Sequence, residues 1–242
     1  LSLAERMLAA TAGGLKAVTL APERPGAEEF IGRLKRAGVS IHLGHSRAKA
    51  ADVSRYVSWG VDAVTHMYNV MPTEPPGTMG VHIVSLTDAL LAEKDLALGL
   101  ICDGIHVDPQ LIRLLGQLPS NRVFLETDAM KYAGTPGMEF EFYPGYRVVS
   151  APGKAVRDRN GGLCGSSLTP DEAMRNYLVY SGQDLVRMAQ ATSLVPARVL
   201  GMESEIGSIA PRKRADFVLL DRATLQVKAT YVDGECVFGG KT

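Results

Sequence analysis

The chain has 242 residues, and its 26 lysines and arginines equal its 26 aspartates and glutamates, so its formal net charge at pH 7 is zero. This length fits one barrel-type domain, alone or with a small appendage. A balanced charge provides no basic field to hold nucleic acid, and no apolar run approaches the roughly 20 residues of a bilayer span. We therefore expect neither a nucleic-acid nor a membrane partner. The 3 cysteines lie far apart, which favours a reducing, cytoplasmic setting without disulfides.

Helices and strands alternate in the first part of the chain. Ser2 is a predicted helix N-cap, and Gly38 and Gly60 are predicted helix stops. The apolar periodicity predicts helices and strands in turn, with helices at residues 2–12, 27–37 and 47–59 and strands at 15–20, around His42 and His45, and through Val64.

The alternation continues as far as residue 127. It predicts a helix at 81–92, a strand at 96–101, a helix at 109–118 and a strand at 123–127. Residues 71–80 are rich in proline and glycine and are predicted to form a loop across the mouth of a site. Because single helices separate the strands, the sheet is expected to be parallel. Five strands are predicted to end near Leu20, Leu43, Thr65, Ile101 and Thr127.

The pattern changes after Asp128. Residues 131–162 contain many glycines and alternating aromatic residues, which predicts a lid-like β-hairpin inserted beside the mouth. Thr169, as an N-cap, and Pro170, at the first helical position, then predict the start of a helix, and helices continue to Leu200.

Short strands dominate the end of the chain. They are predicted at 216–220, 227–232 and 235–238, and Asp233-Gly234 is a strong hairpin turn between the last two. We therefore expect two domains, a barrel domain at 1–205 and the strands of a small domain at 206–242.

Two histidines follow apolar strand runs at matching positions, His45 after the second strand and His66 after the third. Asp128 follows the fifth. The C-terminal ends of parallel barrel strands converge on one mouth, so these side chains are predicted to meet a single cation. One such histidine is more often a satisfied polar residue than a ligand, but two at matching strand ends favour a metal site. His42 has the opposite strand parity from His45 and is predicted to be structural.

Other polar residues near the strand ends have more than one interpretation. Asp103 is either a turn residue or a partner for His106, which lies three positions further on. Cys102 is predicted to lie in the core, and His82 to take part in surface or loop packing. Cys164 could lie near the pocket, but nothing in its context marks it as a nucleophile.

Five motifs carry a resemblance to a known family: Gly44-His45-Ser46, Thr65-His66-Met67-Tyr68-Asn69, Asp103-Gly104-Ile105-His106-Val107-Asp108, Thr127-Asp128-Ala129 and Gly165-Ser166-Ser167-Leu168-Thr169. From Thr19 to Phe238 the chain resembles the N-acetylglucosamine-6-phosphate deacetylases of the amidohydrolase superfamily. This resemblance implies a (β/α)8 TIM-barrel fold with a small β-sandwich domain. It also implies a cytoplasmic homodimer that acts on a small amino sugar.

The resemblance assigns roles to particular residues. His45 and His66 become ligands of a divalent metal ion, zinc or otherwise iron, and Asp128 becomes the catalytic carboxylate. His106 would lie over the substrate. The remaining substrate-binding positions, which orient the sugar, are Asn69, Val70 and the backbone near Leu163.

The chain also departs from the family pattern in two places. We expect it to be incomplete at its N-terminus, with five of eight barrel strands and without the family's upstream acidic metal ligand, for which Glu23 is a possible substitute. Residues 71–80 contain no arginine to grip a sugar phosphate, which leaves unphosphorylated N-acetyl sugars open as substrates. Two alternatives also stay open: an amidohydrolase for another N-acyl compound or cyclic amide, and a non-catalytic remnant that only binds.

Overall fold

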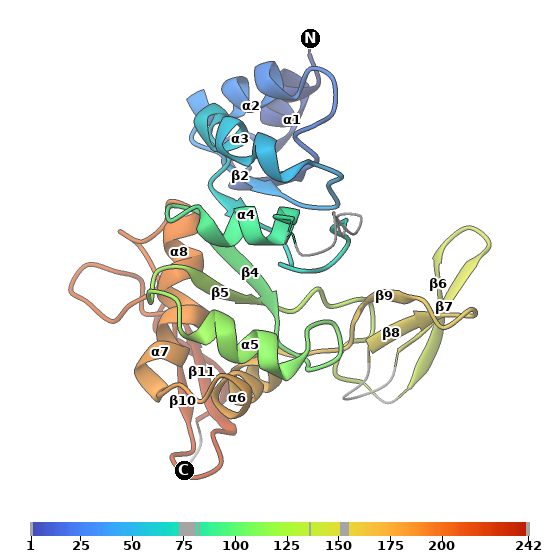
Figure 1. Ribbon diagram of the computed structural model, residues 1–242. Helices are drawn as coiled ribbons and strands as arrows, with labels where there is room; N and C mark the ends of the chain where they lie inside the picture. The colour runs from blue at the N-terminus through green and yellow to red at the C-terminus, as the bar shows by residue number, and fades with distance from the viewer. Residues whose placement is uncertain (1, 73–80, 82, 136, 151–154, 241–242) are drawn as a thin grey trace. The chain divides into compact units, whose positions relative to one another are not determined.

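Parallel strands alternating with helices form the first part of the protein, as the blue-to-green part of Figure 1 shows. The computed structural model describes residues 2–72, 81, 83–135, 137–150 and 155–240. Packing divides the chain into two units, Leu1–Gly99 with Val199–Gly201 (unit 1) and Leu100–Arg198 with Met202–Thr242 (unit 2). The predicted boundary at residue 205 concerns a different division of the chain and stays a prediction.

Unit 1 is built from short βα repeats. Its elements are α1 (Leu3–Thr11), β1 (Ala17–Leu20), α2 (Ala27–Arg36), β2 (Ser40–Leu43), a 3-10 turn (Ala50–Asp52), α3 (Val53–Trp59), β3 (Ala63–Val64), α4 (Leu86–Ala92) and the start of β4 (Ala97–Ile101). The strands pair in parallel and in chain order: Val18 lies opposite Ile41, His42 opposite Ala63, and Ala63 opposite Ala97.

Local capping chemistry sets the first helix of unit 1. The Ser2 hydroxyl accepts a hydrogen bond from the Glu5 backbone N–H, and the Glu5 carboxylate accepts one from the Ser2 N–H, so the two residues form a capping box. The same arrangement of Ser85 and Asp88 begins α4. The predicted N-cap at Ser2 is thus confirmed.

The core of unit 1 lies between its strands and the apolar faces of its helices. Every residue of β2 is buried, as expected for a strand covered on both faces. The fully buried side chains of this core include Tyr56 and several aliphatic residues: Ile31, Leu34, Ile41, Leu43, Leu90 and Leu98.

Unit 2 continues the parallel sheet and then changes architecture. It holds the end of β4, α5 (Pro109–Gly116), β5 (Val123–Glu126), β6 (Met138–Tyr143), β7 (Tyr146–Ser150), β8 (Ala155–Asp158), β9 (Leu163–Ser166), α6 (Pro170–Ser181), α7 (Leu185–Ala189), a π-helical turn (Gln190–Leu194), α8 (Val195–Val199), β10 (Phe217–Leu220), β11 (Val227–Val232) and β12 (Glu235–Gly239). In Figure 1 the yellow sheet β6–β9 stands apart from the helices of this unit.

The fold is part of a (β/α)8 TIM-barrel, with antiparallel strands at its end. Within the described residues, the parallel sheet has the strand order β1-β2-β3-β4-β5, which matches the five predicted strands. The predicted C-terminal strands are confirmed as β10, β11 and β12, joined in an antiparallel sheet. Asp233 and Gly234 both have positive φ in the turn between β11 and β12, as that type of hairpin requires.

Several predicted boundaries were wrong. The helix predicted at 47–59 begins as a 3-10 turn at Ala50, and the one predicted at 81–92 begins only at Leu86. The predicted hairpin at 131–162 is instead a four-stranded antiparallel sheet that extends through β9. Thr169 does precede α6, but its hydroxyl donates to the Asp171 carboxylate and does not cap the helix backbone.

Two predicted features lie partly or wholly outside the described residues. These are the loop at 71–80, of which 73–80 are not described, and the placement of His82. Among the residues that are described, none of the helices has the length and apolar character needed to cross a membrane.

Leu98 provides a test of the unit 1 core. Its side chain is 0% exposed in β4, so Leu98→Ala should reduce the free energy of unfolding by about 2–5 kcal/mol in urea denaturation. The matched control is Leu3→Ala on α1, where the side chain is 60% exposed and a change of less than about 0.5 kcal/mol is expected. Equal effects of the two substitutions would contradict this packing.

Candidate active site

The two predicted metal ligands lie together in unit 1. The ring centroids of His45 and His66 are 4.8 Å apart, and the rings meet edge to face at 67°. His66 is only 4% exposed, whereas His45 is exposed between two buried neighbours. Neutral imidazoles at this separation are suited to bind a divalent transition metal. The donor chemistry therefore fits part of a metal site.

His45 does not lie on a strand. β2 ends at Leu43, and His45 has a positive φ of 49°, so the strand-parity argument that separated it from His42 does not apply. His42 is nevertheless in a structural environment. Its Nε2 lies 3.1 Å from the Ser40 hydroxyl on the same strand, and burial, together with the nearby Lys35, lowers the pKa of its ring against an opposing effect of Asp62.

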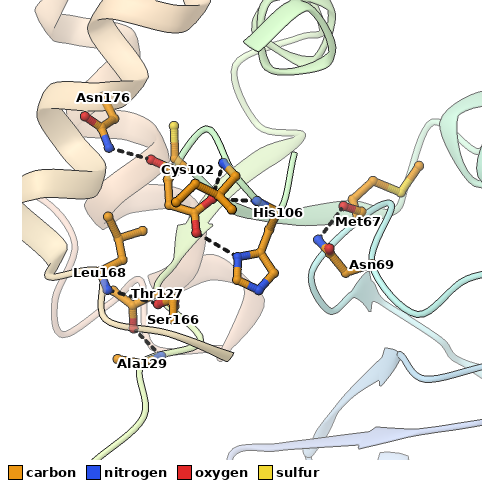
Figure 2. Close-up of polar contacts among 11 residues, drawn as sticks. Met67, Asn69, Cys102, His106, Thr127, Ala129, Ser166, Leu168 and Asn176 are labelled. Atoms are coloured by element: carbon orange, nitrogen blue, oxygen red, sulfur yellow. Dashed lines mark hydrogen bonds and ion pairs between the residues drawn. The ribbon is translucent and has the colours of Figure 1, made fainter. Parts of the chain in front are cut away.

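Left-handed backbone recurs along the segment that follows β3. His66, Tyr68 and Val70 have φ values of 36°, 77° and 50°. A non-glycine residue in this region costs about 1–3 kcal/mol and persists only where its surroundings fix it, and Val70 is β-branched, which makes its conformation still less common. Such strain concentrates at functional sites. Val70 is 62% exposed, and the Asn69 side-chain amide donates to the Met67 carbonyl, as Figure 2 shows.

In unit 2, Asp103 accepts three hydrogen bonds, two from His106 and one from Ile105. One carboxylate oxygen accepts from the backbone N–H groups of Ile105 and His106, both at 2.8 Å, and the other lies 2.7 Å from His106 Nδ1. Figure 2 labels His106 and draws its ring with a dashed line at one ring nitrogen. Asp103 is thus both a turn residue and the partner of His106. The two roles that the sequence offered as alternatives are both present.

The environment of Asp103 keeps it ionised. Burial alone would raise the pKa of its carboxyl, but hydrogen bonds from the His106 side chain and from the His106 and Ile105 backbone outweigh burial and hold the pKa below its usual value. An ionised carboxylate accepts a hydrogen bond from the Nδ1–H group of the ring. This leaves Nε2 of His106 as the ring nitrogen that can contact a ligand.

Asp128 is also held on left-handed backbone. Its φ is 49°, and its carbonyl accepts a 2.8 Å hydrogen bond from the Ser166 N–H. The Ser166 hydroxyl donates to the Thr127 carbonyl and accepts from the Leu168 N–H, as drawn in Figure 2. A Cβ at Gly165 would lie 2.9 Å from the Asp128 carbonyl, so only glycine allows this approach. The motif at 165–169 was the only sequence signal for this support.

Leu163 and Cys164 lie on β9. Leu163 is 42% exposed, and the Cys164 sulfur lies 3.3 Å from the Tyr146 hydroxyl, which donates to Asp158. Cys102, in contrast, is 0% exposed, and burial raises the pKa of its thiol to about 12. Its position confirms the prediction that it belongs to the core and makes it unsuited to act as a thiolate.

The candidate site residues are divided between the units. His45, His66, Asn69 and Val70 belong to unit 1, while His106, Asp128 and Leu163 belong to unit 2, and their convergence stays a prediction. In the parts of the chain that the structure describes, no three His, Cys, Asp or Glu side chains form a group that could hold a metal ion. The two-imidazole pair is therefore the portion of the predicted metal site that the structure places together.

The amidohydrolase family model matches residues 4–237, which is nearly the whole chain. The chain belongs to the amidohydrolase family. Over 96% of its length it is 35% identical to N-acetylgalactosamine-6-phosphate deacetylase of Escherichia coli O157:H7, and over 95% it is 33% identical to N-acetylglucosamine-6-phosphate deacetylase of Bos taurus.

The chain is also similar in structure to a deacetylase whose structure has been solved. An N-acetyl-D-glucosamine-6-phosphate deacetylase variant from Mycobacterium smegmatis, in complex with N-acetyl-D-glucosamine-6-phosphate, superposes with a TM-score of 0.85 at 28% identity over 96% of this chain. This amidohydrolase chain spans 59% of the E. coli relative, 56% of the bovine relative and 60% of the M. smegmatis chain.

The Asp103–His106 pair predicts a pH-dependent contribution to stability. Because the folded-state pKa of Asp103 is depressed, the ionised carboxylate stabilises the fold above the unfolded pKa of about 4, and this stability is lost as pH falls through the lower folded pKa. Asp103→Asn should lower the free energy of unfolding at pH 7 by about 1.5–3 kcal/mol. The difference from the unmodified chain should shrink below about pH 4.

Urea denaturation at several pH values between about 2 and 7 measures this effect, because this range brackets the ordinary pKa of an aspartate carboxyl. Asp184→Asn is the matched control: Asp184 caps α7 by accepting from the Arg187 N–H, and asparagine caps equally well. A stability gap for Asp103→Asn that is independent of pH would show that its ionised form does not stabilise the fold.

Proposed function

We propose that this chain is the catalytic portion of a metal-dependent hydrolase that removes the acetyl group from an N-acetyl amino sugar 6-phosphate. The observation that carries this proposal is the pair of imidazoles on strained backbone after β2 and β3, 4.8 Å apart. The names of the relatives supply the reaction class, and the M. smegmatis complex supplies the class of substrate. The products would be acetate and the free amino sugar phosphate.

In this proposal His45 and His66 hold a divalent metal ion, zinc or otherwise iron. Such an ion, when bound, supplies Lewis-acid chemistry that acidifies water and polarises a carbonyl group. An amide needs this help because its carbonyl is a poor electrophile. His66 is buried and His45 exposed, so the pair can be reached from solvent at His45.

Asp128 is the proposed general base and acid. Its exposed side chain, on backbone fixed by Ser166, is suited to take a proton from the attacking water and to deliver it to the departing amine. Protonation matters because an amine leaves poorly as an anion. One carboxylate can therefore serve both steps of the hydrolysis.

His106 is proposed to contact the substrate through Nε2. Asp103 fixes the ring orientation at Nδ1, so Nε2 has a defined direction without further side-chain ordering. With a proton on Nε2, His106 would donate to a substrate oxygen and stabilise negative charge that develops there. Asn69, Val70 and the backbone near Leu163 would orient the sugar.

The identity of the sugar is a separate question. The E. coli relative is named for N-acetylgalactosamine 6-phosphate and the bovine one for N-acetylglucosamine 6-phosphate, so both epimers belong in any assay. The absence of arginine from residues 71–80 makes the unphosphorylated sugar a third test compound. A cytoplasmic homodimer completes the proposal, and hydrolysis of another N-acyl or cyclic amide is its main alternative.

Acetate release is the direct test. The unmodified protein with added zinc should release acetate from at least one of the two sugar phosphates, and chelation should abolish this. Asp128→Asn keeps a side chain that tolerates left-handed backbone but removes the base, so kcat should fall by about 100- to 10,000-fold. The matched control is Asp95→Asn at an exposed position outside the proposed site, where kcat should not change.

The assay should be run on this chain and on its full gene product. Release of acetate that is indifferent to Asp128→Asn would remove the proposed role of that carboxylate. Absence of release from all three sugars in both proteins, together with no bound metal, would favour a non-catalytic protein that only binds.

A further inference from the structure

Two threonines meet across the end of β2 in unit 1. Thr19 lies on β1, Thr65 follows β3, and their hydroxyl oxygens are 2.8 Å apart, although β2 runs between these two strands. The contact is possible because the residue beneath it is Gly44. A Cβ at Gly44 would lie 2.6 Å from Thr19 Cγ2 and 3.0 Å from Thr65 Cβ, so no side chain fits there.

This contact adjoins both candidate ligands. Gly44 immediately precedes His45, and Thr65 immediately precedes His66. The Thr19–Thr65 hydrogen bond therefore ties the segment that carries His66 to β1, and Gly44, which precedes His45, packs against both threonines. Any change in the spacing of these segments changes the separation of the two rings.

Glu23 fixes the other side of His45. It lies just beyond β1, and its two carboxylate oxygens accept from the Ser46 hydroxyl and from the Arg47 N–H, both at 2.7 Å. The Ser46 hydroxyl also accepts from the Ala48 N–H, and Ser46 is 1% exposed. Both oxygens of Glu23 are thus engaged with the loop that follows His45, so the carboxylate braces this loop.

The backbone at the two histidines needs such support. Both His45 and His66 have left-handed φ values, which an imidazole-bearing residue adopts only when its neighbours fix it. His45 is flanked by Gly44, packed between two threonines, and by Ser46 and Arg47, tied to Glu23. These contacts account for how the exposed His45 keeps its place beside His66.

We propose that Thr19, Thr65 and Glu23 are positioning residues that hold the imidazoles of His45 and His66 at the spacing needed to share one divalent cation. The proposal rests on the proposed function only for the identity of the cation site. The positioning itself is a property of the metal-free protein and can be measured without activity.

The first measurement is made on the whole chain without metal. In protein labelled at histidine with 13C, a nuclear Overhauser effect should connect ring protons of His45 and His66, whose centroids are 4.8 Å apart, with assignment from His45→Ala and His66→Ala. Thr65→Val and Glu23→Gln should weaken or abolish this signal. Thr65→Ser keeps the hydroxyl and should retain it.

The second measurement is zinc affinity, by competition with a chromophoric chelator. Loss of a group that orients a metal ligand typically weakens binding about 10- to 100-fold, and we expect this for Thr65→Val, Thr19→Val and Glu23→Gln. Thr65→Ser should bind zinc as the unmodified chain does. If these residues had a purely structural role, their substitution would lower thermal stability, but Thr65→Val and Thr65→Ser would bind zinc with the same affinity.

Matched controls are available in the same unit. Thr87→Val removes another threonine hydroxyl, which is also 2.8 Å from a hydroxyl partner, Ser85. Glu93→Gln changes another carboxylate that accepts from a serine hydroxyl, that of Ser54. Both controls should leave the ring signal and the zinc affinity unchanged.

The possible outcomes separate the two proposals. An unchanged ring signal and unchanged zinc affinity in Thr65→Val and Glu23→Gln overturn the positioning role. Loss of the ring signal in these variants, with no zinc bound by the unmodified chain or its full gene product, supports the positioning role and overturns the proposed metal site. If Thr65→Val fails to fold, Thr19→Val deletes the same hydrogen bond from the strand farther from His66 and decides the question.

Discussion

Left-handed backbone immediately after parallel strands is the constraint on which the candidate site depends. His45, His66 and Asp128 each have positive φ, between 36° and 49°, and each would relax to an ordinary conformation if its neighbours allowed it. A side chain in this conformation projects differently from one in a continuing strand. The chain therefore turns abruptly at the strand end, and the turn, not the strand, determines where each functional group points.

Both units stabilise these turns in the same chemical way. A buried serine, Ser46 in unit 1 and Ser166 in unit 2, bonds through its hydroxyl to the backbone two residues ahead. Each serine also reaches a distant segment, Glu23 for Ser46 and the Thr127 carbonyl for Ser166. Because a hydroxyl both donates and accepts, it can join a backbone N–H to an acceptor on a distant segment, where a carboxylate or an amide N–H could satisfy only one kind of partner.

The sequence predicted much of the framework and the residue types of the site, but not the backbone that presents them. Capping at Ser2, the strand after Val123 and the Asp233-Gly234 turn depend on neighbours within a few residues, so local patterns reveal them. The β6–β9 sheet was predicted only as a hairpin, because pairing of β8 with β9 is not encoded in alternation alone. The left-handed turn at His45 was missed because positive φ is uncommon at any non-glycine residue, so histidine gives a much weaker local sign of it than glycine.

The same reasoning applies to Glu23, which the sequence offers as a possible metal ligand and the structure places as a brace for the loop after His45. A carboxylate just beyond a barrel strand is a reasonable donor by position, and sequence cannot reveal that both of its oxygens accept hydrogen bonds from Ser46 and Arg47. Asp103 presents the parallel case in unit 2, where a carboxylate near a strand end orients His106. In both cases the acid acts on the geometry around a histidine: Asp103 binds the His106 ring, and Glu23 binds Ser46 and Arg47, which follow His45. Position just beyond a strand does not distinguish this orienting role from metal binding, and only the hydrogen-bond partners do.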